Sequence, residues 1–282
     1  MSKLRPTNRS ILRRLALFAG LTCFVAIVMF PFYWQLVTSI SPPGQLTQLT
    51  LIPDLNNAST DAYFFIFRER NFGRYLYNSF GVASLSTLFG ISIASFSAYA
   101  IARMSFPGKA LLLGLVLSIA MFPQIAIISP IFLFMRDMGL RNTWLGLIIP
   151  YMTFSLPLSM WYLTAFFKTI PDSLEDAARI DGCTPIQAFS KVIFPLALPG
   201  VFTAAILTFI YAWNEYLFAL TINTQDAART MPVGITMFQG EYTLPWVETS
   251  AAVVSVTVPL AIVVLIFQQR IISGATAGAV KE

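Results

Sequence analysis

Six long stretches of this sequence contain no charged residue, and this feature limits the possible folds more than any other. The stretches cover residues 15–53, 75–102, 110–135, 142–167, 192–214 and 249–269, and each holds at least 21 residues. A helix needs about 20 apolar residues to cross roughly 30 Å of hydrocarbon. The sequence therefore predicts an all-α polytopic membrane protein. Its six expected spans cover about 15–38, 77–101, 111–134, 143–167, 199–221 and 249–268.

Two other structural classes do not fit these stretches. Transmembrane β-strands would give about ten residues of alternating hydrophobicity. A soluble domain carries about 25% charged residues on average, whereas only 11% of these 282 residues are charged. The chain has no histidine and two cysteines, Cys23 and Cys183, which cannot form a metal cage. We therefore expect no metal site, no cofactor and no disulfide.

The first apolar stretch resembles a signal peptide only in its basic start. Its apolar run is about twice as long as the core of a signal peptide. Bulky residues occupy positions 30–34, where a cleavage site would need small ones. We expect a retained helix after a short N-terminal segment, residues 1–14, and a single transmembrane domain over residues 15–282.

The distribution of lysine and arginine predicts the orientation of the chain. If residues 1–14 are cytoplasmic, six spans return the C-terminus to the cytoplasm, and the positive-inside rule favours this arrangement by twelve residues to six. The twelve are Lys3, Arg5, Arg9, Arg13, Arg14, Arg103, Lys109, Lys168, Arg179, Lys191, Arg270 and Lys281, and the six are Arg68, Arg70, Arg74, Arg136, Arg141 and Arg229. We expect a multi-pass protein of a bacterial or archaeal cytoplasmic membrane. No basic stripe with stacking aromatic residues suggests a nucleic-acid partner.

The loop at about 168–198, on the expected cytoplasmic side, has the pattern of two short helices. Asp172 or Ser173 is expected to cap the first helix, and Gly182 to end it with a positive φ angle. Thr184 is expected to cap the second helix, with Pro185 at its first position and Gln187 at its third, and Pro195 to end it. The first helix should present Leu174, Ala177 and Ala178 on one face. A rigid, bent element of this kind favours docking into a groove of another protein.

A spaced motif in this loop resembles the EAA loop of ABC importer permeases. The sequence reads Asp176-Ala177-Ala178, three residues, Gly182, nine residues, then Val192-x-Phe194-Pro195. The family pattern is Glu-Ala-Ala, three residues, Gly, nine residues, then Ile-x-Leu-Pro, so the spacing matches throughout. Asp176, Val192 and Phe194 replace Glu, Ile and Leu, and each replacement keeps the charge or the apolar character.

Other segments are similar to the carbohydrate branch of these permeases, the maltose type. They are Leu174-Glu175, Asp181-Gly182, Thr184-Pro185-x-Gln187-Ala188-Phe189, Phe106-Pro107-Gly108-Lys109, Trp213-Asn214-Glu215 and Met231-Pro232-Val233-Gly234. The resemblance covers nearly the whole chain and is strongest to the six-helix second permease. It implies the transmembrane fold of a type I importer and a carbohydrate substrate, either a di- or oligosaccharide or a glycoside. Glycerol phosphate or a polyol is the alternative.

The resemblance also implies a set of partners. These are a second, non-identical permease, two ABC ATPase subunits, an extracytoplasmic sugar-binding protein and the lipid bilayer. The EAA loop would dock on an ATPase subunit. The residues that this implies for coupling are Glu175, Asp176, Ala177, Ala178, Asp181, Gly182 and Pro195.

The chain contains no catalytic or nucleotide-binding motif of its own. It has no Gly-x-x-x-x-Gly-Lys-Ser/Thr segment, so ATP hydrolysis is expected in a partner subunit. An ion-driven secondary transporter would predict charged relays and an inverted repeat, and neither is apparent. An intramembrane enzyme would need a nucleophile with a base, or metal ligands, inside the spans.

Five residues are candidates for the substrate pathway, and each has a packing alternative. Glu215 is the main ionisable residue inside a predicted span, and such acids are functional hypotheses by default. Trp213 and Asn214 beside it offer a stacking face and an amide, but successive helical residues point about 100° apart. Gln124 and Asn78 lie in the third and second predicted spans, and amides buried in a membrane more often bond across helices. A packing role is favoured over substrate contact for both amides, and it is slightly favoured for Glu215.

Overall fold

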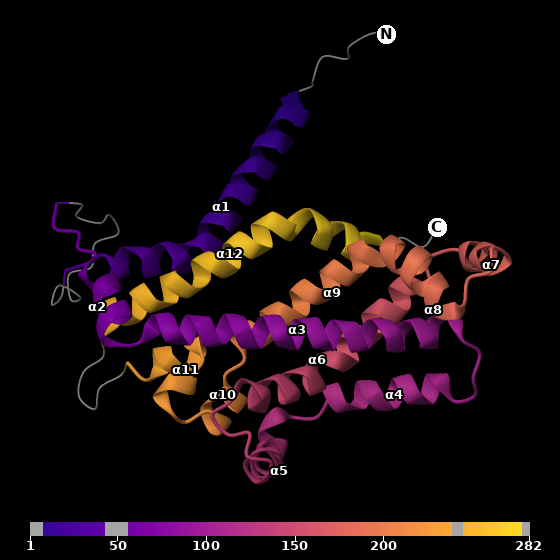
Figure 1. The fold of residues 1–282 in the computed structure, drawn as a ribbon. Coiled ribbons are helices and arrows are strands. Elements are labelled where there is room, and N and C mark those ends of the chain that lie inside the picture. Colours follow the sequence, from indigo (N-terminus) through magenta and orange to yellow (C-terminus); the bar gives the residue numbers. More distant parts are fainter. Residues whose placement is uncertain (1–7, 43–55, 239–244, 278–282) are drawn as a thin grey trace. The chain divides into compact units, whose positions relative to one another are not determined.

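The computed structural model describes residues 8–42, 56–238 and 245–277, and within these residues every regular element is a helix. In chain order they are α1 (Asn8–Ser39), α2 (Asp61–Glu69), α3 (Phe72–Arg103), α4 (Lys109–Ala120), α5 (Gln124–Asp137), α6 (Trp144–Phe167), α7 (Asp172–Ile180), α8 (Pro185–Ala188), the π-helical segment η2 (Phe189–Ile193), α9 (Phe194–Asn214), α10 (Leu217–Ile222), the 3₁₀ segment η3 (Asp226–Ala228), α11 (Met231–Thr236) and α12 (Trp246–Ala277) (Figure 1). The predicted all-α fold class is confirmed.

The chain divides into two compact units. The first contains α1, α2 and the start of α12, and the second contains α3 to α11 with the rest of α12. In the first unit, α1 exposes apolar side chains along most of its length, as a lipid-facing helix would. The end of α1 is held by Oγ of Ser39, which lies 2.8 Å from the Tyr63 hydroxyl on α2.

The second unit is built on α3, α6 and α9, which pack against one another, with α4 packed on α6. Small residues permit the close approach of helices in a membrane. On α3 the residues Ala83, Ala94 and Ala98 are fully buried. On α9 a Cβ at Gly200 would lie 2.5 Å from the Phe166 ring of α6, so the close contact of these two helices requires glycine there.

Five helices of the described residues are long and apolar enough to cross a membrane, and the pair α4 and α5 would be a sixth span. The predicted third span, 111–134, is therefore not one straight helix, because α4 and α5 are bent by 92° at a short break. Pro123 lies in this break with an extended backbone, ψ 122°. Proline lacks an N–H and disfavours helical geometry in the residue before it, which explains the break.

Side-chain contacts show that α3 and α6 run in the same direction. Near their starts, Nε1 of Trp144 donates to Oδ1 of Asn78 at 3.0 Å. Near their ends, the Arg103 guanidinium donates to the carbonyl oxygen of Ile170. The chain must therefore return between these helices, and α4 with α5 makes that return, so the bent pair is best counted as one span.

The predicted fifth span, 199–221, differs from the structure at both ends. The helix begins earlier, because α8, η2 and α9 join into one continuous helix over Pro185–Asn214. The prediction that Pro195 ends the second loop helix is therefore wrong. In the π-helical turn, Phe194 N–H bonds to the carbonyl of Phe189, five residues back, and this wider turn makes room for the proline ring. At the other end, α9 stops at Asn214, and α10 is a separate helix.

Candidate coupling loop and membrane pathway

The loop between α6 and α9 has the two capped helices that its sequence predicts. Gly182 has φ +84°, and the N–H groups of Gly182 and Cys183 bond to the carbonyls of Arg179 and Ala178. This pattern is a Schellman motif, which ends α7 as predicted. Thr184 and Gln187 form a reciprocal capping box that starts α8 at once, with Pro185 at its first turn. The loop is therefore rigid at its bend.

The expected N-terminal cap of α7 is absent. The N-cap position is Pro171, which makes no side-chain cap bond, and Asp172 is the first helical residue. The Asp172 carboxylate forms an ion pair with the Arg103 guanidinium at the end of α3. A contact across the fold has therefore replaced the local cap.

One face of α7 is buried against the rest of its unit. Glu175 and Ala178 are its buried residues. The Glu175 carboxylate accepts a hydrogen bond from the Tyr99 hydroxyl at 3.0 Å and one from the Arg179 guanidinium at 2.7 Å. Nε of Arg103 lies 3.7 Å from its second oxygen. These contacts fix which side of α7 faces inward.

The opposite face of α7 and the start of α8 are exposed. Asp176, Ala177 and Asp181 are exposed, and so are two large apolar side chains, Ile180 at 86% and Ile186 at 74%. The predicted common face of Leu174, Ala177 and Ala178 is wrong, because Ala178 points inward while the other two are exposed. The bonds of Glu175 set this rotation.

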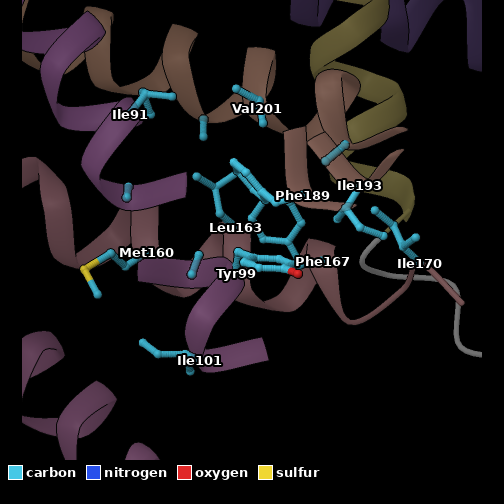
Figure 2. Close-up of a cluster of buried hydrophobic side chains, with 14 residues drawn as sticks. Ile91, Tyr99, Ile101, Met160, Leu163, Phe167, Ile170, Phe189, Ile193 and Val201 are labelled. Carbon is cyan, nitrogen blue, oxygen red and sulfur yellow. The ribbon is translucent and has the colours of Figure 1, made fainter. Parts of the chain in front are cut away.

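An aromatic cluster joins the end of the loop to two spanning helices (Figure 2). The Phe189 ring lies 4.8 Å from that of Tyr99 on α3 and 6.2 Å from that of Phe167 on α6, measured between centroids. Ile193 in the π turn is fully buried in the same cluster. The loop therefore rests on two spanning helices through large rigid side chains.

Asn78 uses its amide within the protein. Its Nδ2 donates to the carbonyls of Ala227 and Arg229, each at 2.9 Å, and its Oδ1 accepts from Trp144. The residue is 1% exposed. These bonds tie α3 to η3 and to α6, which is the packing role that was favoured for this amide.

Gln124 begins α5 and is half-buried. Its Nε2 donates to the Tyr211 hydroxyl of α9 at 2.6 Å. Tyr211 also lines a cavity of about 260 Å³ between α4, α6 and α9. The hydroxyl-bearing residues of this cavity are Ser155, Ser159, Tyr162, Thr208 and Tyr211, and the predicted pathway residues are not among its lining.

Glu215 lies at the break between α9 and α10. Its carboxylate is buried and accepts the backbone N–H groups of Phe218 at 2.9 Å and Ala219 at 3.3 Å. The N-terminus of a helix has unpaired N–H groups and a partial positive charge, so it stabilises a carboxylate. The acid therefore caps α10 rather than standing inside a continuous helix.

The side chains of Trp213 and Asn214, the two residues before Glu215, do not point in the same direction as the Glu215 carboxylate. Trp213 is buried, and its ring stacks on Phe209 at 5.6 Å. Asn214 is exposed, and its Nδ2 donates to the carbonyl of Ile210 one turn back at 2.8 Å. The helical geometry indicated that these three side chains could not all face one path, and in the structure they do not form one surface.

A polar cluster around Asp226 was not predicted from the sequence. The Asp226 carboxylate accepts from the Tyr75 hydroxyl, from Nδ2 of Asn71 at 3.0 Å and from Nη1 of Arg229 at 3.0 Å. The hydrogen bond from Tyr75 is the main cause of the lowered pKa of Asp226. Only the Asp226–Arg229 pair could have been found from spacing. Among the residues described, no three Cys, Asp or Glu side chains gather as metal ligands.

Comparisons with known proteins agree with this architecture. Residues 86–275 match the family model described as "Binding-protein-dependent transport system inner membrane component". The chain is 45% identical over 262 residues to the trehalose transport system permease protein SugB of Mycobacterium tuberculosis, covering 92% of this chain and 95% of that protein. It is also 45% identical over 255 residues to the sulfoquinovosyl glycerol transport system permease protein SmoH of Agrobacterium fabrum, covering 90% and 89%.

A solved structure has a similar fold. It is the crystal structure of a bacterial ABC transporter involved in the import of the acidic polysaccharide alginate. The TM-score is 0.79 at 21% sequence identity, and the match covers 95% of this chain and 99% of that one.

Proposed function

The chain belongs to the family of binding-protein-dependent transport system inner membrane components, and from this membership we propose that it is one permease subunit of an ATP-driven carbohydrate importer. A second, non-identical permease completes the pathway, and an extracytoplasmic sugar-binding protein delivers the substrate. Two ABC ATPase subunits supply the energy, because this chain has no nucleotide-binding motif.

The observation that carries the proposal is the exposed surface of α7 and α8. This element is stiffened by the Schellman motif at Gly182 and by the capping box at Thr184. It presents two highly exposed apolar side chains, Ile180 and Ile186, beside the acids Asp176 and Asp181. A rigid helical element with apolar anchors and a polar rim suits a groove in a partner protein. That partner is the ATPase.

The orientation follows from charge. The excess of lysine and arginine assigns both termini and α7 to the cytoplasm, where ATP is available. In the transport cycle, closure of the ATPase pair moves α7 and α8, and the permeases switch the pathway between its inward-facing and outward-facing states. Such switching is a rigid-body change between two packed arrangements.

The substrate class is proposed from the named relatives. Their transported compounds, trehalose and sulfoquinovosyl glycerol, are a disaccharide and a glycoside. We assign this chain to the same class, with glycerol phosphate or a polyol as the alternative. Glu215, Trp213, Asn214, Gln124 and Asn78 remain candidates for the pathway, although Asn78, Gln124 and Glu215 already hold partners within the chain.

Association with the ATPase tests the docking surface. Ile180→Asp and Ile186→Asp place a charge in the proposed groove, so each should reduce co-purification of the ATPase with the tagged permease by about tenfold or more. Met138→Asp, at another exposed apolar residue after α5, is the control and should keep the ATPase bound. Normal co-purification with both isoleucine variants would exclude this surface.

Activity assays test the division of labour and the substrate. The purified chain alone should hydrolyse no ATP, and the complete complex in liposomes should take up labelled sugar with ATP. A panel of trehalose, other disaccharides, glycosides of glycerol and glycerol phosphate identifies the class. Robust hydrolysis by the single chain, or uptake that follows an ion gradient without ATP, would contradict the proposal.

A further inference from the structure

The last residue of α3, Arg103, is a buried cation directed at the coupling loop. Its side chain is 6% exposed. The guanidinium forms an ion pair with Asp172, donates to the carbonyl of Ile170, and lies 3.7 Å from the Glu175 carboxylate. One side chain of a spanning helix therefore contacts the connection before α7, the first residue of α7 and its buried acid.

Tyr99 makes a second contact from the same helix. It lies four residues before Arg103, so both side chains leave α3 on one face. Its hydroxyl donates to Glu175, whose side chain is also 6% exposed. Oε1 of Glu175 thus accepts hydrogen bonds both from Tyr99 of α3 and from Arg179 of its own helix.

The contacts of Arg103, Tyr99 and Glu175 form a network, and energetic considerations indicate that its role is to orient α7. A buried ion pair loses much of its Coulomb energy to desolvation, and apolar residues of similar size often stabilise a fold equally well. The surrounding cluster of Phe167, Phe189 and Ile193 already supplies apolar burial. Apolar contacts are non-directional, whereas hydrogen bonds to a carboxylate require a defined geometry. The network therefore fixes the rotation of α7 against α3.

Among the five single-helix candidate spans in the described ranges, α3 is the one without an internal proline. Proline occurs in α1, α6, α9 and α12, at Pro31, Pro150, Pro157, Pro195, Pro199 and Pro259. Proline kinks helices, so α3 is the candidate span that no proline kinks. Its 32 residues span about 48 Å at 1.5 Å per residue.

We propose that Arg103, Tyr99 and Glu175 are positioning residues that join α7 rigidly to α3, so that a movement of α7 is transmitted to this spanning helix. The inference rests on the proposed function, in which the ATPase moves α7. Without the junction, α7 would rotate or slide on the aromatic cluster, and ATP would be hydrolysed without opening the pathway.

The test measures sugar uptake and phosphate release together in liposomes that hold the complete complex. The probe is the sugar of the panel above that gives ATP-dependent uptake. Glu175→Gln keeps the size of the side chain and removes its charge, and Tyr99→Phe removes only the hydroxyl. Each variant should raise the number of ATP molecules hydrolysed per sugar by about fivefold or more, the usual lower range of a coupling effect.

Asp137→Asn is the matched control, because Asp137 forms an exposed ion pair with Arg136 at the end of α5. It should leave the ratio unchanged. If Glu175→Gln lowers the yield of complex, Tyr99→Phe decides, since its ring retains the contacts with Phe167 and Phe189.

The inference is overturned if uptake and hydrolysis fall in equal proportion in assembled Tyr99→Phe complex, or if neither variant changes the ratio. Failure of the proposed function has a different signature, which is the absence of ATP-driven uptake in the wild-type complex. In that case the inference falls with it.

Discussion

Glu215 shows how one acidic residue can be accommodated in an apolar segment. Its carboxylate is buried, yet it accepts two backbone N–H groups at the start of α10. A buried polar group costs little when it is fully hydrogen-bonded and much when a partner is removed. The break in the helix therefore provides the partners that make the acid tolerable.

We expect Glu215→Ala to destabilise the protein by about 1–2 kcal/mol, because it leaves the N–H groups of Phe218 and Ala219 unpaired. Glu215→Gln keeps one acceptor, so it should assemble normally but transport more slowly. Thermal unfolding in detergent and uptake kinetics measure the two effects, with Glu69→Gln on the exposed surface of α2 as control. Unchanged uptake in Glu215→Gln would leave the residue a packing role alone.

Gly182→Val should insert into the membrane but lose ATPase association or transport coupling. The φ angle of +84° costs a residue with a Cβ about 1 kcal/mol or more. A Cβ at this position would meet no atom of the chain within 4 Å, so the cost within the subunit is conformational. Co-purification with the ATPase and uptake assays measure the effect.

Asparagine provides the matched control at position 182, because it tolerates a positive φ better than valine does. Gly182→Asn should therefore retain more coupling than Gly182→Val. Normal subunit assembly and normal ATP-driven uptake in Gly182→Val would show that the loop is a plain connector.

Among the elements, α3 is held by polar contacts at both its N-terminal and its C-terminal end. At the C-terminal end, Arg103 and Tyr99 contact α7. At its start, Asn78 bonds to the carbonyls of residues 227 and 229, and Tyr75 donates to Asp226. The helix therefore connects α7 with the segment around η3. The segment around η3 is far away in sequence from both α3 and α7.

The contact with Asp226 predicts a dependence of stability on pH. The pKa of Asp226 is lowered in the folded protein, so the contribution of this group is present above its ordinary pKa and is lost as pH falls through the folded value. The difference in melting temperature between the wild type and Asp226→Asn should be constant from about pH 7 to about 5 and shrink below about pH 4.

Thermal unfolding of both proteins across this range measures the difference. Asp137→Asn, which removes an exposed carboxylate outside this cluster, should show no comparable change. A difference that stays constant at the lowest pH would mean that the Asp226 carboxylate does not stabilise the contact between η3 and α3.

At the scale of the whole molecule, the number of crossings decides where the ends of the chain lie. The parallel directions of α3 and α6 require α4 and α5 together to make one crossing. With α1, α9 and α12 this gives six crossings, within the described part of the chain, by helices of sufficient length and apolarity. An even number returns the chain to the side on which it started.

We therefore expect both termini in the cytoplasm, in agreement with the twelve-to-six distribution of basic residues. Fusions of a reporter that is active on only one side of the membrane, placed at each terminus and after residue 138, measure this. The two terminal fusions should report the cytoplasm and the internal fusion the outside. A terminal fusion active outside would contradict the topology.

Features that depend on a few neighbouring residues could be predicted from the sequence alone. The absence of charge over at least 21 residues predicted the membrane-spanning segments, because a charge in hydrocarbon is costly wherever the helix packs. The end of the first loop helix at Gly182 and the start of the second at Thr184 were also predicted, since caps are formed by residues within five positions of one another.

Which residues these helices bury depends on contacts between distant parts of the chain. The sequence could not show that Glu175 faces inward while Asp176 faces outward, because this rotation is set by a hydrogen bond from Tyr99, 76 residues away, and by an ion pair with Arg103. The break at Glu215 and the unbroken helix through Pro195 were missed as well. A hydrophobic segment can satisfy its backbone in several ways, and the packing around it selects one of them.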